Sequence, residues 1–117
     1  MKASDLRIGN IVGVCYEDIL IADQVIILEP GVVHLSNRKN PDSDRDIVGV
    51  PLQEEWLRKF NFKYNSHSDK WKLNKIIIKK IQSGTVNIWL VQSKTLQMKI
   101  AFVHQLHDLI HVLVKSD

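Results

Sequence analysis

The sequence contains one cysteine, Cys15, so it cannot form an intramolecular disulfide. It has no apolar run long enough to cross a bilayer, because aliphatic stretches such as 25–28 are far too short. Its N-terminus lacks the apolar stretch of a secretory signal peptide. These absences favour a reducing compartment. We therefore expect a cytoplasmic protein with no membrane partner, in which Cys15 is a small buried hydrophobic residue.

The familiar catalytic signatures are also missing. Glycine is scarce, with five residues in 117, and the chain has no G-x-S-x-G motif, no phosphate-binding glycine-rich loop and no C-x-x-C pair. A pairing of Cys15 with a distant histidine stays open, because a sequence does not show which residues meet in space. The sequence therefore predicts a protein that is not an enzyme and needs no cofactor.

The composition is that of an ordinary globular domain, with 44% hydrophobic and 25% charged residues, and we expect a single domain over 1–117. The net charge of +3 conceals an asymmetry. Residues 1–55 carry five basic and ten acidic side chains, whereas 56–117 carry eleven basic and three acidic ones. Such a chain can pair with itself or with another protein, or present a basic face to a polyanion.

Residues 6–35 have the pattern of three short β-strands, with β-branched residues in the strands and turn-forming residues between them. We expect a small antiparallel sheet or partial barrel within a β meander over 5–50. Residues 36–46 have no large apolar side chain, so we expect a mobile loop or a long hairpin tip there. The expected turns are Gly9-Asn10, Glu17-Asp18 and Pro30-Gly31.

Residues 51–117 have the pattern of a helix, a hairpin and a second helix. Acidic residues begin and basic residues end a short helix over 52–60, as the helix dipole prefers, and Asn61 suits the left-handed residue that ends it. A β-hairpin over 76–91 follows, and a C-terminal helix from 103 is expected to pack on the sheet. The predicted fold class is therefore α+β, with helices on antiparallel sheet.

In the predicted hairpin, Ser83-Gly84 is a two-residue turn, which sets Ile77 opposite Leu90 and Ile78 opposite Trp89. The apolar positions of this hairpin and of the two helices predict the core. We expect the largely buried residues to be Trp56, Leu57, Phe60, Ile77, Leu90, Leu106, Ile110 and Leu113.

Three histidines lie at helical spacing near the C-terminus, at positions 104, 107 and 111. On a helix His104, His107 and His111 occupy one narrow arc, so they could share a zinc ion in part. The favoured interpretation is that they mark the boundary of an amphipathic helix, with one ring nitrogen toward water. A zinc site is the lesser alternative, because a helical pair needs a further ligand held in place.

Basic and aromatic residues alternate between 56 and 80, where eight basic residues face one acidic residue. Lysines for phosphates and aromatic rings for bases would make a non-specific site for single-stranded nucleic acid. Alternating lysines are also how exposed strands stay soluble, and the aromatics suit a core. The candidate nucleic-acid-binding residues are Lys63, Lys70, Trp71, Lys72, Lys75, Lys79 and Lys80.

Three segments resemble one family, namely "DLRIGNIV" at 5–12, "VPLQEEWLRKFNF" at 50–62 and "VHQLHDLIHVL" at 103–113. They are similar to small uncharacterised proteins of gut-bacterial (Bacteroidetes-type) genomes and their phages or prophages, which share the patterns DLRIGN, PLxEEWLxKFxF and VHQL. Of the three histidines only His104 lies on the shared pattern, and the family has glycine where this chain has Asn61. The resemblance implies a phage or mobile-element context, with the host cytoplasm as the location, and brings no catalytic residues.

Together these observations favour a protein-binding or assembly role, with another protein or a second copy of the chain as the partner. Non-specific nucleic-acid binding through the lysine-rich region is the alternative, and zinc binding is a minor one.

Overall fold

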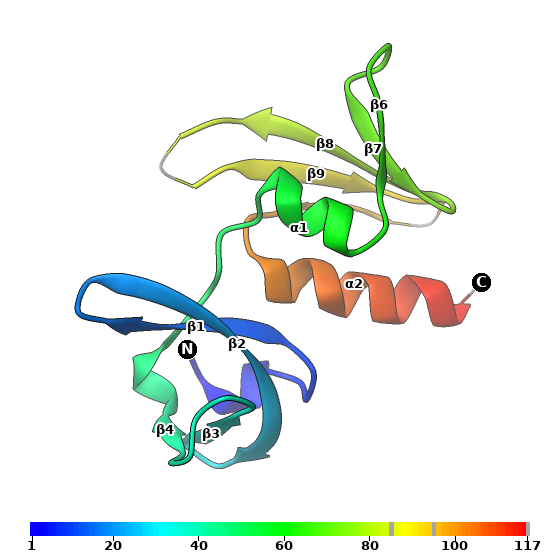
Figure 1. Ribbon diagram of the computed structural model, residues 1–117. Coiled ribbons are helices and arrows are strands. Elements are labelled where there is room, and N and C mark those ends of the chain that lie inside the picture. Colours follow the sequence, from blue (N-terminus) through cyan, green and yellow to red (C-terminus); the bar gives the residue numbers. More distant parts are fainter. Residues whose placement is uncertain (85, 95, 117) are drawn as a thin grey trace. The chain divides into compact units, whose positions relative to one another are not determined.

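The computed structural model describes residues 1–84, 86–94 and 96–116 (Figure 1). The predicted α+β class is confirmed: the chain forms two five-stranded antiparallel sheets, a short central helix and a C-terminal helix. Backbone contacts divide it into two compact units, residues 1–50 with the segment from Phe102 onward, and Pro51–Ala101. The sequence grouped the last helix with 51–101, whereas the structure groups it with the N-terminal unit.

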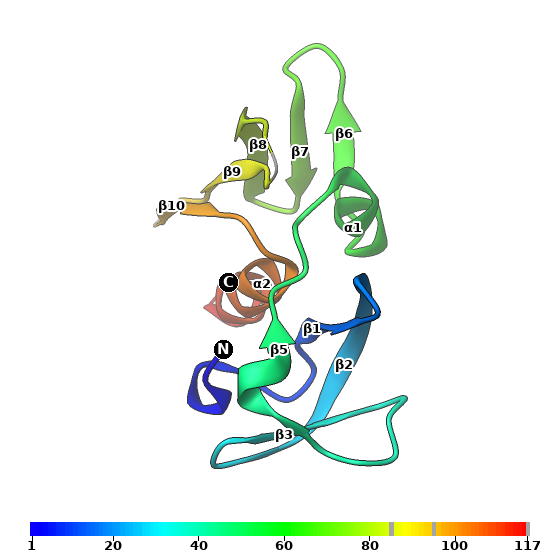
Figure 2. The ribbon, with the colours of Figure 1, turned by 90° about the vertical axis from the view of Figure 1, so that its left-hand side faces the viewer.

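The sheet of the N-terminal unit has the order β4-β3-β2-β1-β5 and is curled (Figure 2). The three predicted strands are confirmed, and both residues of the turn between β1 and β2, Glu17 and Asp18, have positive φ angles of 50° and 66°. Such a turn matches the right-handed twist of the strands that it joins. The strands are β1 (Ile11–Tyr16), β2 (Ile19–Glu29), β3 (Val32–Leu35), β4 (Asp42–Ser43) and β5 (Ile47–Val48).

Of the two alternatives for 36–46, the long hairpin tip is the one that the structure supports, because β4 pairs antiparallel with β3 and residues 36–41 connect the two strands. The segment then continues into a 3₁₀ helix, Asp44–Asp46. Arg38 holds the Asp42 carboxylate through two hydrogen bonds of 2.7 and 2.9 Å, and this contact raises the pKa of Arg38. The Asp44 carboxylate accepts a hydrogen bond from the backbone N–H of Ala3 at 3.0 Å. These polar contacts hold the backbone of the segment in place, although most of its residues are exposed.

The core of the N-terminal unit consists of aliphatic side chains on the inner side of the curled sheet. Alternation along β1 buries Val12 and Val14 there and turns Cys15 outward near the hairpin tip. Cys15 is exposed, so the prediction of a buried cysteine is wrong. The other buried residues of this cluster are Ala3, Leu6, Val25, Val33, Leu35 and Ile47.

The second unit is a sheet of order β10-β9-β8-β7-β6 with the helix α1 (Glu54–Lys59). The helix has Glu54 in its first turn and Lys59 in its last, as predicted, and Asn61 after it has a φ of 71°. That left-handed conformation lets the Phe62 N–H return to the Leu57 carbonyl at 2.9 Å. The strands are β6 (Lys63–Asn65), β7 (Lys70–Leu73), β8 (Ile76–Gln82), β9 (Ile88–Gln92) and β10 (Gln97–Ile100).

The hairpin predicted over 76–91 is confirmed as β8 and β9, but its register is wrong. Ile77 lies opposite Gln92, and Ile78 lies opposite Val91. The predicted register assumed a two-residue turn at Ser83-Gly84. The connection from β8 to β9 is longer than that, and the register shifts between Lys80 and Gln82, so the cross-strand pairs differ from those predicted.

The predicted core is confirmed in part. Leu57, Leu106 and Leu113 are buried, but five other named residues are only partly buried. In the hairpin, the buried residues lie on the side of the sheet that carries Trp71. The predicted core residues of the hairpin, Ile77 and Leu90, lie on the other side. The partly buried residues are Trp56, Phe60, Ile77, Leu90 and Ile110; the hairpin residues that are buried instead are Ile76, Ile78, Trp89 and Val91.

The C-terminal helix α2 (Val103–Ser116) begins at the predicted residue and contacts β1 of the N-terminal unit. Among the helices that the structure describes, none combines the length and the apolar character needed to cross a membrane.

Candidate functional site

One face of the β6–β10 sheet carries a set of lysines. Directly opposite residues of antiparallel strands point to the same side, and Lys63 lies opposite Lys72 while Lys79 and Lys99 both lie opposite Leu90. Since residues two apart in a strand also share a side, Lys70 joins them. We call this set the lysine face, and it consists of Lys63, Lys70, Lys72, Lys79 and Lys99. The sequence missed Lys99, because β10 was not predicted.

The lysine face has no carboxylate among the described residues of its unit. Glu54 and Glu55 lie on α1, and Asp69 accepts a hydrogen bond from the Tyr64 hydroxyl at 2.5 Å. Tyr64 lies opposite Trp71 and therefore on the other side of the sheet. Like charges directly opposite one another, as in the pair of Lys63 and Lys72, destabilise a sheet, so the fold itself does not favour this arrangement.

The aromatic residues lie on the opposite side from these lysines. Trp71 and Trp89 are 4% and 1% exposed, and the Trp89 indole N–H donates to the Leu52 carbonyl at 2.9 Å. Trp71 is therefore a core residue and does not offer a ring for base stacking. Of the remaining candidates, Lys75 lies in the turn between β7 and β8, and Lys80 lies on the side of Trp89.

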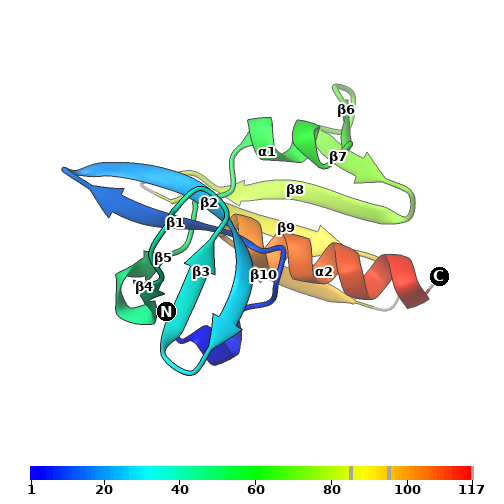
Figure 3. The ribbon, with the colours of Figure 1, turned by 60° about the horizontal axis from the view of Figure 1, so that its bottom comes forward.

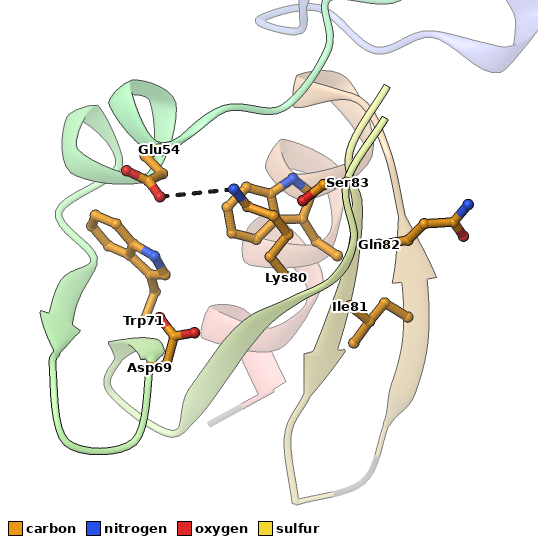
Figure 4. Close-up of a pocket in the computed structure, with 8 residues that line it drawn as sticks. Glu54, Asp69, Trp71, Lys80, Ile81, Gln82 and Ser83 are labelled. Atoms are coloured by element: carbon orange, nitrogen blue, oxygen red, sulfur yellow. Dashed lines mark ion pairs between the residues drawn. The ribbon is translucent and has the colours of Figure 1, made fainter. Parts of the chain in front are cut away.

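A pocket of about 320 Å³ lies between α1 and the indole-bearing side of this sheet. Figure 4 shows Glu54 and Lys80 pointing toward each other beside Trp71, with 3.9 Å between carboxylate and ammonium. Lys80 also lies 5.4 Å from the centre of the Trp89 ring. The other lining residues are Asp69, Ile81, Gln82 and Ser83.

The polar groups of this pocket already interact with the chain. Asp69 accepts the Tyr64 hydroxyl, and this hydrogen bond raises the pKa of Tyr64. The ion pair of Glu54 and Lys80 is partly exposed, so water screens it and it contributes less than about 1 kcal/mol. The lining residues include no histidine or cysteine that could act as a base or a nucleophile with Ser83. We therefore assign the pocket no chemistry.

The three C-terminal histidines do not converge. His107 Nδ1 lies 3.0 Å from the side-chain nitrogen of Asn10, while His111 is exposed. Asn10 is a completely buried residue whose amide also donates to Asp108 at 2.8 Å. Within residues 1–84, 86–94 and 96–116, no three His, Cys, Asp or Glu side chains are grouped so that they could hold a metal ion. His107 and Asp108 instead attach α2 to the turn before β1.

His104 is partly buried, and its ring stacks on Phe102 with 6.0 Å between the ring centres. Its Nδ1 is buried without a hydrogen-bond partner. Burial lowers the pKa of His104, and the nearby Asp108 opposes this shift only in part. The ring is therefore held in its neutral form near neutral pH.

Acidification is expected to destabilise the protein through His104. Because its pKa is lower in the folded state, the unfolded state binds more protons below about pH 6.5, and the free energy of unfolding falls as the pH is lowered. Urea unfolding of the wild type and of His104→Gln at pH 7.5 and 5.5 measures this effect. The pH dependence should be smaller in the variant, whereas His67→Gln, at an exposed residue, should keep it. Equal pH dependence in all three proteins would contradict the prediction.

A third feature is the β1–β2 hairpin, whose tip extends beyond the short strand β5 (Figure 3). β5 pairs only with Gly13 and Val14, and β3 pairs with β2 only from Val25 onward. In the described part of the chain β1 is therefore the only strand paired with residues 19–22 of β2. The other edge of this segment, which we call the β2 edge, is open.

The open hairpin is also apolar. Tyr16, Ile19, Leu20 and Ile21 are 40–65% exposed, although they lie in regular β-structure. Soluble proteins usually protect such an edge with charge, proline or a covering segment, because exposed apolar edges pair with other strands. The sequence pattern predicted strands for these residues but not their exposure. The signal for the exposure is the unbroken aliphatic run at the start of β2.

No protein-family model matches this chain, and no curated protein and no solved structure matches it at a significant level.

Proposed function

We propose that this chain is a non-enzymatic assembly module, of the phage or prophage accessory type that the sequence resemblance implies, and that it binds a second copy of itself through the β2 edge. The observation that carries this proposal is the open, aliphatic segment 19–22. The chemistry of such an edge is strand addition, in which main-chain hydrogen bonds join two sheets and side chains select the partner.

The direction of the backbone groups supports strand addition. The two-residue turn makes Tyr16 and Ile19 a hydrogen-bonded pair, so odd-numbered residues of this segment point their N–H and C=O groups at β1. Even-numbered residues point the other way, as the hydrogen bond from the Ser36 N–H to the Gln24 carbonyl at 2.9 Å shows. Leu20 and Ala22 therefore present four backbone groups at the β2 edge.

These groups are self-complementary about a two-fold axis through Ile21. In an antiparallel pairing centred there, Leu20 of one copy lies opposite Ala22 of the other, and both pairs exchange N–H···O=C bonds. The two Ile21 side chains then meet in a pair without hydrogen bonds, where side chains approach most closely. The contact area is small, so we expect a reversible dimer whose population depends on protein concentration.

The Ala22→Pro substitution tests this dimer. The Ala22 N–H points to the open edge, so proline removes no hydrogen bond of the monomer and is tolerated on an edge strand. Sedimentation equilibrium at increasing concentration should show dimers for the wild type and monomers for Ala22→Pro. Ala22→Thr is the matched control, because it keeps the N–H and should still dimerise.

A second pair of variants tests the apolar part of the contact. Ile21→Lys places a charge at the proposed two-fold axis and should also give monomers, whereas Ile8→Lys changes another exposed isoleucine and should not. Unchanged far-UV circular dichroism would show that the variants are folded. A wild type that remains monomeric, or an Ala22→Pro variant that dimerises as well as the wild type, would disprove the proposal.

A further inference from the structure

We propose a second function, beyond assembly: the lysine face is a docking surface for the phosphate backbone of double-stranded nucleic acid. The unit that contains it, Pro51–Ala101, carries ten basic and three acidic side chains, a net charge of +7. The other unit carries six basic and ten acidic ones, a net charge of −4. The positive charge of the chain is therefore concentrated in the unit that presents the lysine face.

The lysines of this face are available to an anion. Lys63, Lys72, Lys79 and Lys99 are exposed, and Lys70 is partly exposed. None of the five forms a salt bridge, in contrast to Lys80 on the other side of the sheet, which lies 3.9 Å from the Glu54 carboxylate. No salt bridge of these five lysines occurs among residues 1–84, 86–94 and 96–116. Phosphates that bind here would therefore meet lysines without competition from neighbouring carboxylates, and each contact would release counterions.

The same face lacks what single-strand binding requires. Base stacking contributes about 1–3 kcal/mol for each base in single-strand binding proteins and needs exposed aromatic rings. Both indoles of the sheet, Trp71 and Trp89, are buried on the opposite side. The lysine face also contains no arginine, which is the better reader of base edges. Binding through it would depend on backbone charge, which is denser on a duplex than on a single strand.

An acidic protein is the other class of partner that positive charge could attract. Protein interfaces, however, are depleted in lysine and have an apolar centre. On the lysine face the aliphatic residues between the lysines, Ile77 and Leu90, are only partly exposed. The face therefore fits a partner that offers dense negative charge and requires little apolar contact.

Fluorescence anisotropy with a labelled 30-base-pair duplex, at salt concentrations from 50 to 200 mM, tests the proposal. If about five lysines contact phosphates, the slope of log K against log salt is about −4.5, a loss of roughly 500-fold over this range. The triple variant Lys63→Gln, Lys72→Gln, Lys79→Gln should reduce the slope to about −1.8. A single strand of the same length should bind more weakly than the duplex at every salt concentration.

The matched control is the triple variant Lys2→Gln, Lys39→Gln, Arg45→Gln, which removes the same charge from exposed residues of the other unit. It should bind the duplex as the wild type does. Equal loss in both triple variants, tighter binding of the single strand, or displacement of the duplex by polyglutamate at equal charge concentration would overturn the proposal. Polyglutamate competition would identify an acidic protein as the partner. The Ala22→Pro variant distinguishes this proposal from the proposed dimer. It should bind the duplex as the wild type does, because Ala22 lies outside the lysine face.

Discussion

Replacing Asn10 with alanine is expected to lower the free energy of unfolding by about 3–5 kcal/mol, since three side-chain hydrogen bonds of a fully buried residue are lost. The Asn10 amide donates to His107 Nδ1 at 3.0 Å and to the Asp108 carboxylate at 2.8 Å. Its oxygen accepts the Arg7 N–H at 2.7 Å. The bond to the carboxylate involves a charge and is the strongest of the three.

The loss would exceed the sum expected for exposed hydrogen bonds, because alanine leaves the polar partners in place without their donor or acceptor. The Asn10 side chain connects the turn before β1 to α2, and its backbone connects that turn to β2, where the Val25 N–H donates to the Asn10 carbonyl at 2.9 Å. The backbone bonds survive the substitution, so α2 should detach before the sheet opens.

Urea unfolding followed by far-UV circular dichroism measures this effect, with the exposed Asn40→Ala as the control that should stay within about 0.5 kcal/mol of the wild type. Tryptophan fluorescence should be recorded in parallel, because all three tryptophans belong to the unit Pro51–Ala101 and Asn10 does not. A loss below about 1 kcal/mol would show that the side chain of Asn10 does not anchor α2.

Leu106→Ala is expected to cost about 2–5 kcal/mol, the range for removing a fully buried leucine. Leu106 belongs to the apolar stripe of α2 and is completely buried, so truncation removes its apolar contacts and leaves a cavity. The helix itself is not the cause, since alanine is at least as good a helix former as leucine.

Val112→Ala in the same helix is the matched control, because Val112 is 49% exposed and should change stability by less than about 0.5 kcal/mol. Ile110→Ala should fall between the two, as Ile110 is only partly buried. Coincident thermal melts of Leu106→Ala and the wild type would contradict the packing of α2 that the structure describes.

The elements whose formation depends on nearby residues were predicted correctly. The turn at Glu17-Asp18, the left-handed Asn61 and the start of α2 at Val103 all follow from local backbone preferences and apolar periodicity. The α+β class follows in turn, because a change of apolar period along the chain distinguishes strands from helices. These features could be predicted without any knowledge of distant contacts.

Strand register could not be predicted from the local sequence. An irregularity near Lys80 shifts the pairing of β8 with β9, so a count outward from Ser83-Gly84 fails. Both faces of this hairpin carry aliphatic residues, so the alternation could not show that Ile78 is buried and Ile77 only partly so. β10 has a weak pattern of its own and forms a strand by pairing with β9.

The same distinction between local pattern and strand pairing applies to the candidate surfaces. The sequence by itself determined the types of the elements that have a clear apolar pattern, the excess of lysine after residue 56 and the helical spacing of the histidines. Only the tertiary structure decided that Lys99 joins Lys63 on one face while Trp71 lies on the other, because strand pairing assigns each side chain to a side of the sheet. It also decided the contact of Asn10 with Asp108, which are 98 positions apart, since no local preference specifies a hydrogen bond between residues that only the folded chain brings together.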